Sequence, residues 1–193
     1  MKFFVTSDQH YGHGRIIEYA NRPFSCAEEM NEVMIKRFNE RVKPEDTTFI
    51  IGDFCFKHPV VDDVIAGGRP LKANQWLERL NGTKIIIRGN HDNNNSTKTI
   101  INCIHITYAG QRINLVHKPE HANMNFPINL VGHVHDKWKF QEYQHPISFN
   151  SSENQWYCEK GIMFNVGVDV NRFYPITLDE VLSQISKYKK EIK

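Results

Sequence analysis

Two histidines one residue apart carry the clearest chemical signal in the chain. They end the run LVGHVH, which occupies residues 130–135. Side chains alternate in direction along an extended segment, so His133 and His135 are expected to project from one face. Gly132 would let backbone or a ligand approach closely. Imidazole nitrogens placed in this way are natural ligands for divalent transition metals, although two surface histidines can share this spacing by chance.

Four further strand-like runs end in polar residues of the same kind. With the histidine pair, they supply carboxylates, imidazoles and one amide: Asp8, His10, Asp53, Asn90, His91, His117, His133 and His135. Such a mixed set of nitrogen and oxygen donors suits Mn²⁺, Fe, Zn²⁺ or Ni²⁺. Seven ligands drawn from this set exceed what one transition ion with an open position needs, but they suit two ions that share a bridging carboxylate. Two ions roughly 3.5–4 Å apart can activate a bridging water and hold a phosphoryl group for displacement.

Strands and helices must bring these residues together. Strands are predicted at residues 2–7, 47–51, 83–88, 112–116, 128–131 and 162–168, where apolar or β-branched residues run together. A helix is predicted from Ser25, with Glu28 completing a capping box and an apolar stripe behind it. A last helix is predicted from Thr177, with Glu180 in the same capping position.

Length and composition point to one soluble domain. The chain has 193 residues and a formal net charge of only +2, which argues against a nucleic-acid binder held by a strong basic field. Its four cysteines stand far apart without a C-x-x-C pair, a usage typical of reduced thiols. No apolar run approaches the length of a membrane span. A cytoplasmic protein that binds no membrane is therefore expected.

Five motifs in order resemble the calcineurin-like metallophosphoesterases. They are D-x-H at residues 8–10, G-D at 52–53, G-N-H-D at 89–92, a histidine at 117 and G-H-x-H at 132–135. The runs NRPF at 21–24 and NVGVD at 165–169 add to the resemblance. Together these motifs look like the small, single-domain bacterial and phage branch of predicted phosphoesterases.

The resemblance implies an α/β fold, a four-layer αββα sandwich of two mixed β-sheets with metals at the strand ends. It implies that Asp8, His10 and His135 hold one divalent ion, that Asn90, His117 and His133 hold a second, and that Asp53 bridges them. Mn²⁺ is the leading candidate, with Fe, Ni²⁺, Zn²⁺ or Mg²⁺ as alternatives. By the same resemblance, His91 faces the scissile phosphate and either protonates the leaving oxygen or stabilises charge on the phosphoryl group, and Asp92 orients the His91 imidazole.

Two further residues have open interpretations. His13 lies a few residues beyond His10 and could contact the phosphate or cap the first helix. Arg22 could bind phosphate, but a structural ion pair or cap is the favoured interpretation. Both are candidate substrate-binding residues.

The segment 136–160 is rich in aromatic residues and could be an insertion in the domain. It contains six of them: Trp138, Phe140, Tyr143, Phe149, Trp156 and Tyr157. A hairpin or a long loop is expected, and its aromatic residues could pack on the sheet, contact a second copy or cover the active site. If they do not pack, we favour a cover, because bases stack readily on aromatic faces.

The leading hypothesis for function is a phosphodiesterase or phosphomonoesterase that uses two metal ions, with a bridging hydroxide as the nucleophile. Its expected substrate is a small or nucleotide-like phosphate ester. The first alternative is a nuclease of the same fold, against which the weak net charge argues. The second is a non-catalytic scaffold, against which the complete ligand set argues.

Overall fold

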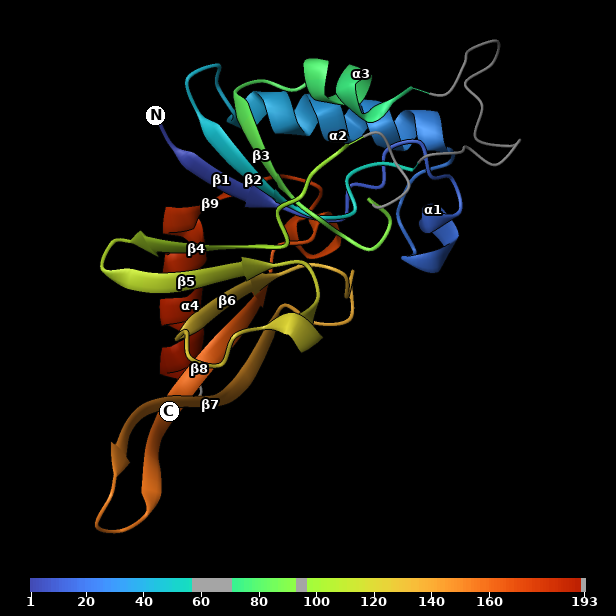
Figure 1. Cartoon of the computed structure of the whole chain (residues 1–193). Coiled ribbons are helices and arrows are strands. Elements are labelled where there is room, and N and C mark those ends of the chain that lie inside the picture. Colours follow the sequence, from blue (N-terminus) through green and yellow to red (C-terminus); the bar gives the residue numbers. More distant parts are fainter. Residues whose placement is uncertain (57–70, 93–96, 192–193) are drawn as a thin grey trace.

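The computed structural model describes residues 1–56, 71–92 and 97–191, and nine strands in this part of the chain form two mixed sheets (Figure 1). The first sheet has the order β3 (Thr83–Ile87), β2 (Thr47–Ile51), β1 (Phe3–Thr6) and β9 (Ile176–Thr177). The second has the order β4 (Cys103–Tyr108), β5 (Gln111–Val116), β6 (Ile128–Val131), β8 (Gln155–Asn165) and β7 (Phe140–Asn150). Strands β1, β2 and β3 are parallel to one another, as are β5, β6 and β8, whereas β9, β4 and β7 run antiparallel to their neighbours. The predicted two mixed sheets are confirmed.

Four α-helices and two short 3₁₀ turns complete the described part of the chain. They are α1 (Ile16–Tyr19), α2 (Ala27–Arg41), α3 (Ala73–Glu78), α4 (Leu178–Glu191), η2 (Pro119–His121) and η3 (Val168–Asn171). The capping box of α4 is confirmed, because Thr177 N–H donates to the Glu180 carboxylate and Glu180 N–H donates to the Thr177 hydroxyl. None of the described helices is both long and apolar enough to cross a membrane.

Helix α2 starts later than predicted. Its first residue is Ala27, and the Cys26 side chain accepts the N–H of Glu29 as the N-cap. The backbone N–H and hydroxyl of Ser25 both donate to the Glu29 carboxylate. The capping role that the sequence predicted for Glu28 is therefore performed by the next residue, Glu29.

The core forms on both faces of the first sheet. Helices α2 and α3 cover its outer face, where Met30, Phe38 and Trp76 pack with Phe4 and Ile50 (Figure 1). Its inner face packs against the second sheet through alternate residues of the strands: Val5, Phe49, Ile51, Ile113, Leu115, Leu130 and Phe164. Period-2 alternation thus sends neighbouring residues of β1 and β2 into different cores.

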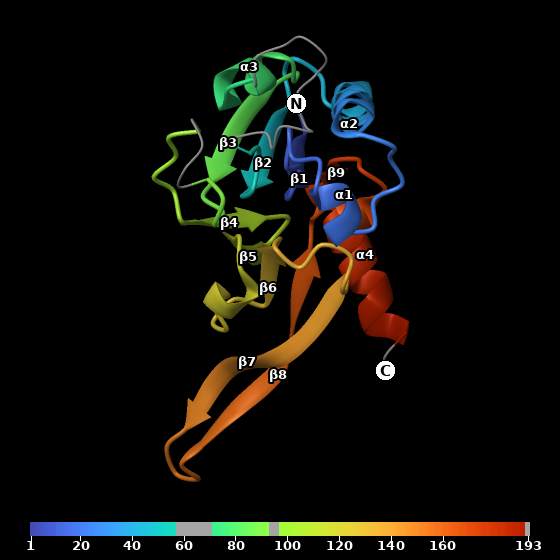
Figure 2. The same cartoon turned by 90° about the vertical axis from the view of Figure 1, so that its right-hand side faces the viewer.

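Helix α4 contributes to the core between the two sheets. Val181 and Ile185 are buried in the core between the sheets, and Figure 2 shows the helix alongside β8. The far face of the second sheet carries a polar row in which His105, Asn114 and Asn129 are paired across β4, β5 and β6. The burial of Val181 and Ile185 places the apolar stripe of α4 against the space between the sheets.

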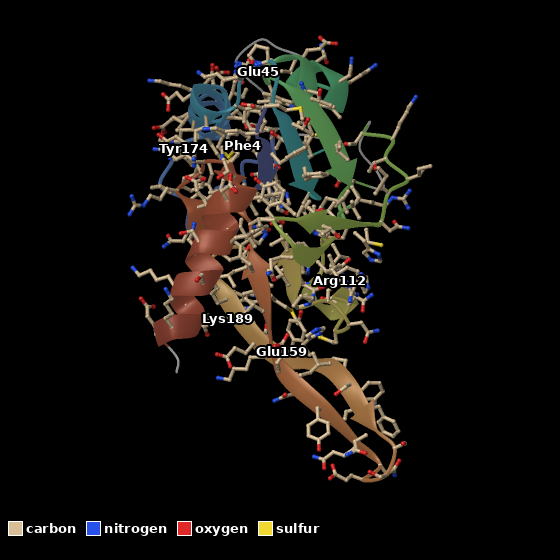
Figure 3. All side chains as sticks on the ribbon, turned by 90° about the vertical axis from the view of Figure 1, so that its left-hand side faces the viewer. Phe4, Glu45, Arg112, Glu159, Tyr174 and Lys189 are labelled. Carbon is tan, nitrogen blue, oxygen red and sulfur yellow. The ribbon has the colours of Figure 1, made fainter. Side chains whose placement is uncertain are left out.

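The aromatic-rich segment forms the hairpin β7–β8, which extends away from the body (Figures 2 and 3). At its base, Phe140 stacks on Tyr188 with ring centroids 4.3 Å apart. Trp138 and Tyr143 also pack on the domain, as one of the three interpretations predicts. Near the tip, by contrast, the side chains of Ile147, Phe149, Trp156 and Tyr157 are between 46% and 59% exposed.

The predicted cover over the strand ends is wrong for the tip of this hairpin. β8 pairs in parallel with β6 through residues 162–165, so its carboxyl end lies beside the carboxyl end of β6. The turn before β8 must then lie at the opposite end of the sheet. The tip of the hairpin therefore lies away from the motif that follows β6 (Figure 2).

Candidate metal centre

The predicted ligands converge where five strands end. The segments that directly follow β1, β2, β3, β5 and β6 carry these side chains to one edge of the molecule (Figure 1). Two clusters form there, each with its ligand atoms within 4.8 Å of one another: Asp8, His10 and His135 in one, and Asp53, His117 and His133 in the other. Within the described residues, this is an arrangement that could hold two metal ions.

Asp53 belongs to the second cluster and also faces the first. Its Oδ2 atom is 3.7 Å from His10 Nε2 and 3.3 Å from His117 Nε2. The amide oxygen of Asn90 is 3.1 Å from His117 Nε2, which places Asn90 with the second cluster. One carboxylate oxygen can thus reach groups from both clusters, as a bridging ligand requires.

The backbone at the ligands is left-handed rather than extended. Five of them have positive φ: Asp8 at 61°, His10 at 53°, Asp53 at 52°, His133 at 70° and His135 at 48°. This conformation is uncommon for residues other than glycine and is often found at functional sites. It also corrects the prediction that His133 and His135 share one face, because the left-handed backbone sends them into different clusters.

Two glycines allow the ligand segments to approach one another. Gly52 has a φ of 81°, and a Cβ atom there would lie 2.5 Å from His117 Nδ1. A Cβ atom at Gly132 would collide with the Ser7 hydroxyl and the Asp8 carboxylate. A side chain at either position would therefore displace a segment that carries ligands.

Hydrogen bonds fix the orientation of three ligands. His117 Nδ1 is 2.8 Å from the Ile51 carbonyl oxygen, and His135 Nδ1 is 3.0 Å from Asp169 Oδ2. Each bond fixes one ring nitrogen and leaves Nε2 directed into the site. The Asp8 carboxylate accepts the N–H of His133 at 2.9 and 3.0 Å, which ties the first motif to the last.

Burial and mutual interaction set the charges of the ligands. Burial raises the pKa of the Asp8 carboxyl and lowers the pKa of His10 well below its usual value. Burial would also raise the pKa of Asp53, but the hydrogen bond and charge of His117 hold it below the usual range. For His117, burial would lower the pKa, but Asp53 and Asp8 raise it to about 9. Metal ions bind the neutral imidazole, so His117 would have to release its proton when an ion binds.

His10 gives the best indication that the centre suits metal ions. Both of its ring nitrogens are buried, and neither has a hydrogen-bond partner among the described residues. Buried polar atoms are normally paired, so an imidazole in this state is suited to coordinate a cation. The mixed imidazole, carboxylate and amide donors agree with divalent transition metals.

Comparison with known proteins gives the family. The profile of the calcineurin-like phosphoesterases matches residues 1–189. The chain belongs to this family. Over 188 residues, the chain is 32% identical to the uncharacterized protein MJ1445 of Methanocaldococcus jannaschii. The matched region covers 97% of this chain and 93% of that protein. The structure of AQ665 from Aquifex aeolicus, a protein of unknown function, has the same fold, with a TM-score of 0.61 and 21% identity over 95% of this chain and 98% of that one.

Asp169 is a residue of this phosphoesterase centre that the sequence interpretation missed. Besides His135, it binds Arg22, whose Nε atom lies 2.8 Å from Asp169 Oδ1. The remaining guanidinium nitrogens donate to the carbonyl oxygens of Gln9 at 2.9 Å and Asp8 at 2.6 Å. Arg22 is therefore a buried structural residue. Of its two interpretations, the contacts agree with the structural ion pair rather than with phosphate binding. The run NVGVD contains Asp169, but its sequence gives no sign of this role.

Asp92, predicted to orient His91, accepts hydrogen bonds from the backbone. Its Oδ2 atom accepts the N–H groups of Asp53 and Gly89, each at 2.8 Å, and its Oδ1 atom accepts the N–H of Phe54 at 3.2 Å. Both oxygens thus bind backbone, because two turns meet at this point. The carboxylate joins the segment after β2 to the segment after β3.

His91 and His13 lie beside the two clusters. The His91 side chain is 42% exposed, and its Nε2 atom is 4.0 Å from Asp53 Oδ2. The buried His13 ring stacks on Phe56 with centroids 4.2 Å apart and lies 5.6 Å from the His10 ring. Both predicted residues are therefore near the metal centre, His91 at its open side and His13 behind it.

A cleft of about 490 Å³ adjoins the second cluster. Its lining includes Arg88, Asn90, Asn102, His117, Lys118 and His121. Ligand pockets in proteins typically measure roughly 300–1,000 Å³. The cleft is therefore large enough for part of a substrate to lie beside the metal centre.

Proposed function

We propose that this phosphoesterase binds two divalent ions and hydrolyses a phosphodiester or phosphomonoester of a small or nucleotide-like substrate. Family membership supports a metal-dependent phosphoesterase. The position of Asp53 Oδ2, within 4 Å of nitrogens from both clusters, is the observation that carries the dinuclear proposal.

The ligands divide as their contacts suggest. Asp8, His10 and His135 would hold one ion and Asn90, His117 and His133 the other, with Asp53 shared. Mn²⁺ is our first candidate for both positions, and Fe, Ni²⁺, Zn²⁺ and Mg²⁺ suit similar donors. Bound ions would supply positive charge for the phosphoryl group and an activated water as nucleophile. The protein then has to hold the ester and move protons.

His91 is the proposed proton donor. Its ring is the most exposed of the imidazoles around Asp53, so it can meet an ester held at the clusters. A positioned imidazole can protonate the leaving oxygen as the bond to phosphorus breaks. The His91 N–H donates to Asp53 Oδ1 at 2.9 Å, which fixes the backbone of this residue relative to the shared ligand.

Metal content and a panel of esters test the proposal together. Protein loaded with excess Mn²⁺ and then desalted is expected to retain two ions per chain by elemental analysis. The same protein is expected to hydrolyse bis(p-nitrophenyl) phosphate or p-nitrophenyl phosphate, with rates that differ among Mn²⁺, Mg²⁺, Ni²⁺ and Zn²⁺. If the protein binds one ion or fewer per chain even when it is titrated with excess metal, the proposal of a dinuclear centre is wrong. If it hydrolyses none of the esters with any of these metals, the proposal of a hydrolase is wrong.

We also propose that the protein acts in the cytoplasm on soluble substrates. The exposed residues Cys26, Cys103 and Cys158 are free thiols, in keeping with a reducing compartment. A long nucleic acid is a less favoured substrate, since the formal net charge is only +2.

The tip of the hairpin is expected to have no part in turnover. The variant Trp156→Ala should leave KM and kcat within about twofold for both a nucleotide ester and a simple aryl ester, because surface changes away from the chemistry rarely exceed about 0.5 kcal/mol. Steady-state kinetics on the two substrates check this. A selective rise in KM for the nucleotide ester would show instead that the tip reaches the site in solution.

A further inference from the structure

The cleft beside the second cluster is more basic than the rest of the centre. Two of its lining residues, Arg88 and Lys118, are cationic, and none of the described residues that line it is acidic. Asn102 and His121 add neutral hydrogen-bonding groups. We infer that this cleft binds a second phosphate group of the substrate, next to the phosphate that is cleaved. This inference rests on the proposed function and specifies its substrate class.

Arg88 is held in place before any substrate binds. Its Nε and Nη2 atoms donate to the Thr99 carbonyl oxygen at 3.2 and 2.8 Å, and its backbone N–H donates to the Ile101 carbonyl oxygen at 2.7 Å. The Thr99 hydroxyl in turn donates to the Ile86 carbonyl oxygen of β3. These bonds fix the guanidinium at the cleft, and a fixed cation loses little conformational freedom when an anion binds.

Lys118 is the more adaptable of the two cations. Its Nζ atom is 3.4 Å from Glu120, whose side chain is more than half exposed. Exposed ion pairs of this kind contribute little to stability, so the ammonium group can turn from Glu120 to a bound phosphate. Lys118 directly follows His117 in the chain, which keeps it beside the second cluster.

The geometry favours a substrate with phosphate groups at two positions of one small molecule. Asn90 and His117 belong both to the cleft and to the second cluster, so a molecule in the cleft continues from the metal centre. A nucleoside that carries a phosphate ester at one hydroxyl and a phosphate at another matches this arrangement. Charge-assisted hydrogen bonds from Arg88 and Lys118 would hold the second phosphate.

A matched pair of substrates tests this inference. The p-nitrophenyl ester of thymidine 5′-phosphate is compared with the same ester carrying a 3′-phosphate, on the Mn²⁺-loaded protein. The wild type is expected to have the lower KM for the phosphorylated ester. Lys118→Met should raise that KM about tenfold, since a hydrogen bond to a charged group is lost, and should raise KM for the other ester much less. Lys118→Arg should restore most of the difference.

Lys137→Met is the matched control. Lys137 is exposed and lies two residues after His135, near the first cluster and outside the residues that line the cleft. Its loss removes the same charge and is expected to change KM for the two esters alike. If Lys118→Met affects both esters equally or neither, the inference is wrong.

A binding measurement separates this inference from the proposed hydrolysis. Calorimetry with thymidine 3′,5′-bisphosphate on the metal-loaded protein needs no turnover. Lys118→Met is expected to weaken this binding about tenfold, and Lys137→Met is expected to leave it unchanged. Equal affinity in Lys118→Met and wild type overturns the phosphate site, even if both hydrolyse bis(p-nitrophenyl) phosphate. Weakened binding in a protein that cleaves no ester supports the site and refutes the hydrolase.

Discussion

Replacing His91 with alanine is expected to lower kcat by about 10²–10⁴-fold, the usual effect of losing a general acid or base. Metal content should remain that of the wild type. The hydrogen bond of His91 to the shared ligand Asp53 is donated by its backbone N–H, which alanine keeps. The imidazole itself is 42% exposed, so its loss should cost little stability. Single-turnover kinetics and elemental analysis of the same preparation check both statements.

His105→Ala provides a control for loss of a surface imidazole. His105 is exposed on β4, in the polar row of the second sheet that faces away from the first sheet. Its replacement is expected to leave kcat and metal content unchanged. The assigned role of His91 is contradicted if His91→Ala keeps its kcat, or if it loses metal in proportion to activity. A further check uses an ester whose leaving group has a low pKa. The loss of kcat in His91→Ala should be smaller with this ester, because its leaving group needs less protonation.

The sequence was sufficient to predict the ligand set because each ligand follows a strand. Parallel strands bring their carboxyl ends to one edge, so Asp8 and Asp53, which follow the parallel strands β1 and β2, meet without further information. His117 and His133 follow the parallel strands β5 and β6 in the same way. The apolar runs that define these strands are visible in the sequence, and the polar residue after each run marks its end.

Contacts made by residues outside this pattern could not be predicted. Asp169 lies in the short turn η3, 34 residues after its partner His135, and only the folded chain brings the two side chains together. The direction of the hairpin depends on the parallel register between β6 and β8, which residue types alone do not specify. The apolar stripe of α4 is visible in the sequence, but the sequence does not show that Val181 and Ile185 join the core between the two sheets.

The Asp53→Asn variant is expected to lose most of its bound metal and nearly all of its activity together. Asparagine has almost the same shape and tolerates the left-handed backbone of this position, where φ is 52°. The change therefore removes chiefly the negative charge at Oδ2, the atom that lies near both clusters. Without that charge, two cations would face one another across a neutral amide, and mutual repulsion should expel at least one of them.

Asp46→Asn controls for the loss of a carboxylate that is equally enclosed. Asp46 accepts the N–H groups of Lys2 at 2.6 Å and Lys43 at 2.9 Å, and it directly precedes β2, at the end opposite to the metal centre. Its replacement is expected to lower the melting temperature while metal content and kcat stay close to wild type. Elemental analysis, circular dichroism and hydrolysis of one aryl ester on all three proteins make the comparison. An Asp53→Asn protein that is folded and still binds two ions per chain would show that this carboxylate does not bridge them.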